Sequence, residues 1–350
     1  MASVALTDIE VDAAVGRGFV VATPRSFDSQ RWPRALLTTP PVFVRALFFG
    51  TGPHPLFDAE RKKGRPDRVA PLATLIDEVR ADLALPGAPH SSRGRLVFGT
   101  LHLETPDTND GKELSGVCKA IAKPLTENLR DRGAFGIDAA LPALHVLFID
   151  GANAFVGASL APWGSRWAMG IPRLRMPAGA PSRSTLKLVE ALHTFLGERE
   201  LDLLHAGMRA VDLGAAPGGW TWQLAHRGLR VTAVDNGPLK GDIADDPLVT
   251  HLRVDGLRYL PKKPVDWMVC DIVVQPSRIA SLVARWIGEG HAQRSIFNLK
   301  LPMKKRYDEV RRCEGIIRDA LNRAHVKHTL ALRQLYHDRE EISGYCAKAA

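Results

Sequence analysis

From residue 183 onward, short apolar runs of strand length alternate with longer segments whose apolar residues recur at helical spacing. Strands are predicted at 208–213, 230–234, 249–254, 265–270, 295–299, 328–335 and 342–347, and helices at 184–196, 218–226, 277–288 and 305–324. Alternating strand–helix units form parallel sheets with helices on both faces. The last two strands have no helix between them and should pair antiparallel. The pattern therefore predicts an α/β, Rossmann-like domain with a mostly parallel seven-stranded sheet.

The first half of the chain follows another pattern, in which short apolar runs are separated by Pro and Gly. Strands are predicted at 18–22, 42–49, 95–103, 144–149 and 154–158, and helices at 72–83 and 112–132. We therefore divide the chain into four parts. These are an N-terminal α+β, ferredoxin-like region (1–90), a second α+β module (91–165), a linker rich in Pro, Gly, Trp and Arg (166–182) and the α/β domain (183–350).

Charge points to the class of partner. The 350 residues include 47 Lys and Arg against 38 Asp and Glu, a net charge of +9. Residues 1–180 hold 21 basic and 18 acidic side chains, and residues 181–350 hold 26 and 20, so the α/β half carries most of the excess. A basic surface favours a polyanionic partner such as nucleic acid. The basic run 61–65 is better explained as a solvated loop than as a phosphate-binding patch.

Composition excludes several classes of protein. A hydrophobic fraction of 45% is typical of globular chains and argues against disorder. No apolar run approaches the ~20 residues that a membrane helix needs, and the N-terminus lacks the basic and apolar regions of a secretory signal. The four cysteines are far apart and form no CxxC pair, which argues against a metal site. We expect a protein of the reducing cytoplasm without a membrane partner.

A Gly-rich turn follows the first strand of the α/β half, where residues 211–220 read VDLGAAPGGW. Such a turn lets the backbone approach a ligand closely, and the helix that follows presents free N–H groups. The turn lacks the Gly-Lys-Ser/Thr ending of a P-loop, and Ala216 replaces the second glycine of a dinucleotide fingerprint. Gly-rich turns also occur without ligands, but acids that follow the next two strands, Asp235 and Asp255, favour a nucleoside cofactor. Because a phosphate-binding signature is absent, S-adenosylmethionine (SAM), which has no phosphate, is favoured.

Acidic and basic residues stand at several predicted strand ends. Asp235 follows the second strand, where an acid accepts hydrogen bonds from ribose hydroxyls, and Asp255 could bind the amine of an adenine. Asp271 and Lys300 end two further strands, and Glu341 precedes the last one. Lys187 lies on the helix predicted at 184–196, which precedes the strand that leads into the Gly-rich turn. A lone charged residue at a strand end is usually solvated, but these residues should share one edge of the sheet.

With these residues the chain resembles the FtsJ/RrmJ-type ribose 2'-O-methyltransferases, which have a Lys-Asp-Lys-Glu tetrad. Among them it resembles most the RlmM family, which methylates the large-subunit ribosomal RNA. The matching stretches are 180–188, 211–221, 234–238, 267–271, 296–307 and 334–341, with looser matches at 106–114 and 169–175. The resemblance implies that residues 91–165 form a THUMP-like RNA-binding module. Because the chain starts late and ends soon after the last strand, we expect it to lack the family's first strand and helix and a basic tail.

The resemblance also implies the site residues and the reaction. SAM contacts fall on Ser184, Ala216, Pro217, Gly218, Gly219, Asp235, Asp255 and Asp271, in the turn that begins at Gly214. Lys300 is the implied proton acceptor, and Lys187, Asp271 and Glu341 complete the tetrad. The implied reaction is SAM-dependent 2'-O-methylation of a cytidine in the peptidyl-transferase region of 23S ribosomal RNA. We expect a monomer that acts before ribosome assembly is complete.

The residues leave the role of Lys300 open. A lysine accepts a proton only if burial or a neighbouring cation such as Lys187 lowers its pKa. Asp271 and Glu341 favour the charged lysine, which would orient the hydroxyl and stabilise a developing alkoxide instead. Lys304, Lys305 and Arg306 could clamp a phosphate. His337, by contrast, is more readily explained as structural than as a catalytic base.

Two other functions remain possible from the sequence. A non-catalytic RNA-binding or ribosome-assembly factor could retain the methyltransferase fold, although the intact tetrad argues against it. A dinucleotide-dependent oxidoreductase is opposed by the broken glycine fingerprint at Ala216.

Overall fold

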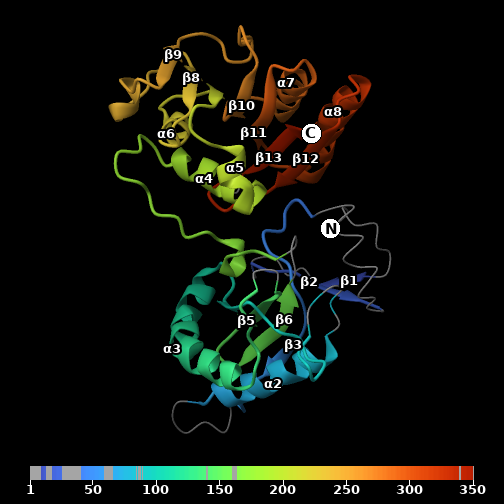
Figure 1. Cartoon of the computed structure of the whole chain (residues 1–350). Coiled ribbons are helices and arrows are strands. Elements are labelled where there is room, and N and C mark those ends of the chain that lie inside the picture. The colour runs from blue at the N-terminus through green and yellow to red at the C-terminus, as the bar shows by residue number, and fades with distance from the viewer. Residues whose placement is uncertain are drawn as a thin grey trace. The chain divides into compact units, whose positions relative to one another are not determined.

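A computed structural model describes residues 9–12, 18–25, 41–58, 66–83, 85, 88, 90–138, 141–159, 164–338 and 340–349. The basic run 61–65 lies outside these residues. The chain divides into two compact units, Met1–Pro172 and Arg173–Ala350, each of which we describe by itself (Figure 1). No helix in the described residues is both long enough and apolar enough to cross a membrane.

The C-terminal unit contains a seven-stranded sheet in the order β12-β13-β11-β10-β7-β8-β9. Its strands are β7 (Arg209–Leu213), β8 (Arg230–Val234), β9 (Val249–Leu252), β10 (Val265–Cys270), β11 (Ala292–Lys300), β12 (His328–Arg333) and β13 (Glu341–Lys348). All neighbours pair in parallel except β13, which is antiparallel to both β11 and β12. The predicted Rossmann-like α/β architecture and its antiparallel last pair are therefore confirmed.

Helices cover both faces of this sheet. They are α4 (Ser184–Phe195), the short α5 (Glu200–Leu203), α6 (Gly219–Ala225), α7 (Pro276–Gly288) and α8 (Arg306–Arg323), with 3-10 turns at Gly197–Arg199 and Gly241–Ala244. On one face, Leu188 and Leu224 from α4 and α6 pack with Trp267 of β10. Met268, which alternates with Trp267 along the strand and so faces the other side, is also fully buried. This double burial explains why the strands are continuously apolar.

The N-terminal unit is built around a four-stranded sheet in the order β3-β6-β5-β4. Its elements are β3 (Phe49–Pro55), α2 (Val69–Asp82), β4 (Thr100–Glu104), α3 (Asn109–Asp131), β5 (Ala143–Phe148), β6 (Asn153–Ser159) and a 3-10 turn at Ala168–Gly170. Two short strands, β1 (Ile9–Asp12) and β2 (Val21–Pro24), pair antiparallel. The side chain of Thr108 accepts a hydrogen bond from the Gly111 N–H and caps α3. The division at residue 90 and the THUMP-like character of residues 91–165 stay predictions.

The strand predicted at 42–49 is wrong, because the chain forms β3 only from Phe49 onward. The apolar run before it contains turns instead. β3 reads FGTGPHP and carries turn-forming residues, but it can pair with β6 because Gly50 allows a close approach: a Cβ at Gly50 would lie 2.2 Å from the Val156 carbonyl oxygen. A proline is tolerated there because β3 is an edge strand.

Candidate active site

Strand pairing brings three of the predicted residues to one edge of the sheet. Lys300 is the last residue of β11, and it lies directly opposite Glu341, the first residue of the antiparallel β13. Asp271 follows the last residue of β10, the parallel neighbour of β11 on its other side. The Lys300 Nζ lies 3.5 Å from Asp271 Oδ1 and also contacts Glu341 Oε2.

Helix α4 supplies the fourth residue. Lys187 Nζ lies 2.5 Å from Glu341 Oε1 and 3.8 Å from Asp271 Oδ2. Each carboxylate therefore contacts both lysines, and the four side chains form one ion cluster. Glu341 is only 2% exposed, whereas Lys300 is 26% exposed and is the lysine more open to a ligand. Glu340 is exposed, so the structure places Glu341 rather than its neighbour in the cluster.

The cluster alters the proton affinities of its members. Burial lowers the pKa of Lys187, but the charges and hydrogen bonds of Asp271, Asp338 and Glu341 outweigh this and raise it above its ordinary value. Burial, and secondarily the charge of Asp271, raises the pKa of Glu341 to about 6, although hydrogen bonds from both lysines act against the rise. The site therefore holds Lys187 as an ammonium and Glu341 as a carboxyl that titrates near neutral pH.

Asp338 is a member of this cluster that the sequence analysis missed. Its Oδ2 lies 2.8 Å from Lys187 Nζ. Burial raises its pKa, but the hydrogen bond from Lys187 and others lower it to about 2 overall. Asp338 lies on the loop between β12 and β13, where no strand or helix periodicity signals its position.

A buried carboxylate on α4 holds that loop in place. Glu190 accepts hydrogen bonds from the backbone N–H groups of Tyr336 and His337, at 2.7 and 3.0 Å, and its Oε2 lies 2.5 Å from His337 Nδ1. Glu190 stands one helical turn from Lys187, so α4 both presents the lysine and anchors the loop that carries its partner Asp338. These contacts give His337 a structural role, in agreement with the sequence analysis.

The Gly-rich turn packs against the start of α4. Gly214 and Gly218 have φ values of +81° and +115°, which favour glycine. A Cβ at Gly219 would lie 2.4 Å from the Ser184 Oγ, so this glycine lets the two segments meet. Trp220 Nε1 donates to the Ser184 carbonyl at 3.0 Å and fixes the contact. The structure therefore brings Ser184 to the predicted cofactor turn.

The two acids predicted for the nucleoside have different environments. Asp235 holds the turn itself: Oδ2 accepts from the Ala216 N–H at 3.0 Å, and Oδ1 accepts from the Gly237 N–H at 2.7 Å. Asp255 is 52% exposed and lies 3.5 Å from Arg258. Its neighbour Gly256 lies beside the turn, because a Cβ there would be 3.8 Å from the Gly214 nitrogen. Both acids therefore border the turn, with Asp255 free to meet solvent.

A buried carboxyl in β7 forms a hydrogen bond that connects the two elements on either side of the Gly-rich turn. Asp212 is fully buried, and its Oδ2 accepts a hydrogen bond from Thr221 Oγ1 at 2.6 Å. Burial is the main cause that raises its pKa to about 7, and the charges of Asp271 and Asp235 add to the rise. Because Thr221 lies on α6, this bond ties the strand before the turn to the helix after it.

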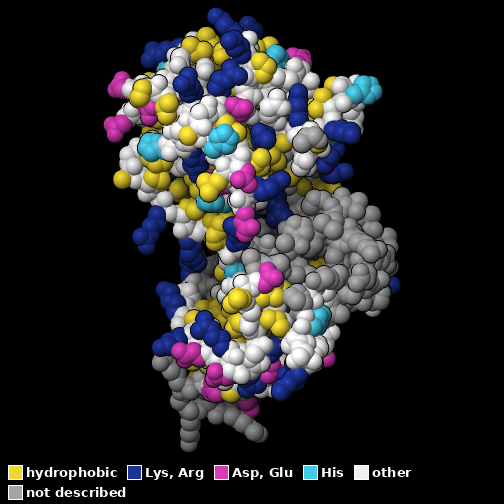
Figure 2. All heavy atoms as spheres, in the orientation of Figure 1, with side chains coloured by type: hydrophobic (Ala, Val, Ile, Leu, Met, Phe, Trp, Pro, Cys, Tyr) yellow, Lys and Arg dark blue, Asp and Glu magenta, His cyan; other side chains and the backbone are white. Residues whose placement is uncertain are grey.

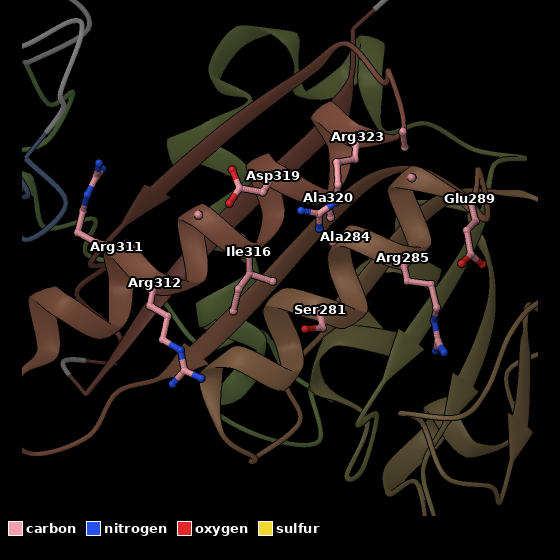
Figure 3. Close-up of a pocket in the computed structure, with 13 residues that line it drawn as sticks. Ser281, Ala284, Arg285, Glu289, Arg311, Arg312, Ile316, Asp319, Ala320 and Arg323 are labelled. Atoms are coloured by element: carbon pink, nitrogen blue, oxygen red, sulfur yellow. The ribbon is translucent and has the colours of Figure 1, made fainter.

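A groove of about 730 Å³ lies elsewhere in the C-terminal unit, between α7 and α8 (Figure 3). Small residues such as Ala284 and Ala320 line it together with arginines that include Arg312 and Arg323. It contains none of the predicted site residues. The proposed phosphate clamp lies just before and at the start of α8, where Lys304 and Lys305 are exposed and Arg306 donates to the Pro302 carbonyl at 3.1 Å.

Comparison with known proteins decides the family. Residues 67–160 match the family described as "Ribosomal RNA large subunit methyltransferase M, N-terminal", and residues 180–322 match the family described as "FtsJ-like methyltransferase". A protein of Azoarcus sp. (strain BH72) named ribosomal RNA large subunit methyltransferase M is 48% identical over 307 residues, which cover 87% of this chain and 78% of the relative. The chain belongs to the RlmM family. Its C-terminal unit is therefore an FtsJ-like methyltransferase domain.

Two further RlmM relatives show the same extent of similarity. The protein of that name from Aromatoleum aromaticum is 52% identical over 281 residues, 80% of this chain and 76% of the relative. The one from Methylococcus capsulatus is 52% identical over 304 residues, 87% of this chain and 80% of the relative. The similarity therefore extends well beyond the methyltransferase domain into the N-terminal unit.

Proposed function

We propose that this RlmM-family protein is a SAM-dependent enzyme that methylates the 2'-hydroxyl of a cytidine in the peptidyl-transferase region of 23S ribosomal RNA. The observation that carries the proposal is the convergence of Lys187, Asp271, Lys300 and Glu341 at the strand ends that also bear the Gly-rich turn. The names of the relatives supply the large ribosomal RNA as the substrate class. We place the reaction in the cytoplasm, on RNA not yet fully assembled, with a monomeric enzyme.

The residues around the turn fit SAM. Gly218 and Gly219 leave backbone without side chains where a Cβ would meet Ile243 or Ser184. Asp235, Asp255 and Asp271 follow successive strands and offer acceptors for ribose hydroxyls, an adenine amine and the cationic end of the amino acid. We assign the remaining contacts to Ser184, Gly214, Ala216 and Pro217. When bound, SAM supplies an electrophilic methyl group on a positively charged sulfur.

Lys300 is the residue that we assign to the 2'-hydroxyl. With SAM bound, the hydroxyl oxygen would form a bond to the methyl carbon as the carbon–sulfur bond breaks, S-adenosylhomocysteine would leave, and the hydroxyl proton would pass to water. Positioning of the two reactants and help with this proton are the contributions a protein can make. Contacts with Asp271 and Glu341 hold the Lys300 amino group in place before the RNA binds, which suits orientation of the hydroxyl and stabilisation of negative charge on its oxygen.

RNA is the partner that best suits the surface. In Figure 2, Lys and Arg side chains are dispersed over the visible face of the methyltransferase domain. Lys304 and Lys305 are exposed four and five residues after Lys300, close enough in the chain to contact a phosphate beside the target nucleotide. We propose that the N-terminal unit contributes further RNA contacts as a THUMP-like module.

Methyl transfer from labelled SAM to ribosomal RNA that lacks the modification tests this function. We expect label in the large-subunit RNA together with saturable SAM binding. RNA binding without transfer would support the assembly-factor alternative, and NADH binding without SAM binding would support an oxidoreductase. Either result would contradict the proposed activity.

A further inference from the structure

A buried amide lies directly behind the ion cluster. Asn298 of β11 pairs with Ser343 of β13, two residues before the pair formed by Lys300 and Glu341. Since side chains alternate along a strand, both pairs project from the same face of the sheet. Asn298 is 1% exposed and Ser343 is 5% exposed. Neither side chain is accessible to a substrate, so any effect on the reaction must pass through the residues they touch.

The Asn298 amide bridges two carboxylates of the cluster, those of Asp271 and Glu341. Its Nδ2 donates to Asp271 Oδ1 at 3.0 Å and to Glu341 Oε1 at 3.3 Å. An ionised carboxylate only accepts hydrogen bonds, so the nitrogen side of the amide must face the two acids. Ser343 Oγ donates to Asn298 Oδ1 at 2.7 Å and so satisfies the opposite side. The hydroxyl thereby fixes which way the amide points.

This arrangement solves an electrostatic problem. Two carboxylates at close range repel each other, and each can rotate toward a lysine in more than one way. A neutral group with two N–H bonds holds one oxygen of each acid without adding charge and leaves the other oxygens, Asp271 Oδ2 and Glu341 Oε2, facing Lys187 and Lys300 respectively. Buried polar groups that are fully paired fix a unique geometry.

We infer that Asn298, oriented by Ser343, is a positioning residue that sets the separation and orientation of Asp271 and Glu341 and through them the place of the Lys300 ammonium. This inference rests on the proposed methyl transfer for its effect on rate. Its effect on the carboxyls themselves does not depend on that function. Donated hydrogen bonds stabilise an ionised carboxylate, so loss of the amide should make Glu341 harder to ionise.

The test compares Asn298→Ala, Asn298→Asp and Ser343→Ala with a matched control, Ser295→Ala. Ser295 is a fully buried polar residue of the same strand, and its hydroxyl contacts Met268 rather than the cluster. We expect Asn298→Ala to lower kcat by on the order of 10²-fold, with the dissociation constant for RNA within about twofold of wild type and with the acid limb of the pH–rate profile at higher pH. Asn298→Asp keeps the shape but adds a fourth carboxyl group to the cluster, and it should lose at least as much activity as the alanine variant.

A second readout does not require catalysis. The carboxyl carbon of Glu341 is followed by NMR as a function of pH, and its midpoint should move upward in Asn298→Ala and, to a smaller extent, in Ser343→Ala, but not in Ser295→Ala. If the wild-type protein transfers no methyl group, the proposed function fails while this titration still decides the inference. An unchanged midpoint overturns it, as does a fall in kcat that Ser295→Ala reproduces. If Asn298→Ala does not fold, Ser343→Ala gives the same decision.

Discussion

Glu341 controls the charge balance of the site, because it is the most buried member of the cluster and contacts both lysines. Its pKa of about 6 means that the cluster gains a negative charge between mildly acidic and neutral pH. Lys187, which contacts Asp271, Asp338 and Glu341, is the lysine most affected by this change. The residue-level arrangement therefore predicts a pH effect that can be measured on the protein without RNA.

Replacement of Glu341 by Gln should remove one pH-dependent part of stability. In the folded protein this carboxyl has a pKa of about 6, against 4.5 for an ordinary glutamate. Because the folded protein disfavours ionisation of this carboxyl, the protonated form contributes its full stabilisation below pH 4.5. This contribution is lost as pH rises through 6. The difference corresponds to about 2 kcal/mol. The free energy of unfolding of wild type, relative to Glu341→Gln, should fall by about that amount from pH 4.5 to 7 in denaturant titrations. A parallel pair of curves would contradict the assignment.

At the scale of elements, much of the fold could be predicted from sequence. The strands and helices of the methyltransferase domain have strong hydrophobic periodicity, and each is observed within a few residues of its predicted bounds. Four of the cluster residues stand at or beside strand ends or on a periodic helix, so parallel topology alone suggests that they meet. Hydrophobic periodicity does not predict a strand whose pairing depends on close approach of the backbones. β3, with its glycines and prolines, is such a strand.

Two residues of the site, Asn298 and Asp338, are not predicted by the sequence pattern. Asn298 stands two positions before Lys300, so strand alternation places it on the same face, but a single asparagine in an apolar strand does not reveal its hydrogen bonds. Asp338 lies on a loop whose position is set by Glu190, a residue almost 150 positions away in sequence. Long-range contacts of this kind have no local pattern, and only the folded structure shows them.

The pairing of β11 with β13 carries the site, and Gly344→Ala should disrupt it. A Cβ at Gly344 would lie 2.3 Å from the Phe297 ring, which is fully buried. We expect a loss of about 1–3 kcal/mol in unfolding free energy and a fall in methyl transfer. Gly315→Ala is the control, because nothing lies within 4 Å of the new Cβ on α8, and alanine should be neutral or stabilising there. Equal stability of the two variants would contradict this packing.

The N-terminal unit has a buried polar network that should govern its stability. His145 Nδ1 lies 2.9 Å from Glu104 Oε2, His145 Nε2 lies 2.7 Å from Ser159 Oγ, and Glu104 Oε1 accepts from the Met169 N–H at 2.5 Å. Glu104→Ala leaves buried donors unpaired and should cost on the order of 3 kcal/mol in unfolding free energy.

The exposed Glu127, paired with Lys123 at 3.9 Å on α3, provides a control for this prediction. Glu127→Ala should change the unfolding free energy by less than about 1 kcal/mol. Denaturant unfolding of both variants measures the difference. A cost for Glu104→Ala no larger than that for Glu127→Ala would show that the network does not stabilise the unit.

At the scale of the whole molecule, charge links the chain to RNA. Most of the net charge of +9 lies in the methyltransferase half, which has 26 basic and 20 acidic side chains. RNA binding should therefore weaken steeply with salt. Lys304→Glu should lower RNA affinity and flatten the salt dependence without changing SAM affinity. Arg230→Glu makes the same charge change at the first residue of β8, at the opposite edge of the sheet from the cluster, and should have the smaller effect. Filter binding at several salt concentrations measures both, and equal losses would argue against a phosphate contact at Lys304.

The central claim is that Lys300 and its partners place a methyl group on one ribose of the large ribosomal RNA. Its most direct test is a nucleotide-resolution map of 2'-O-methylation, read by resistance to alkaline hydrolysis, after unmodified 23S ribosomal RNA is incubated with SAM and either wild type or Lys300→Ala. We predict one protected cytidine in the peptidyl-transferase region with wild type, and none with the variant although it still binds SAM. Equal protection by both proteins, or methylation confined to a base, would contradict the account.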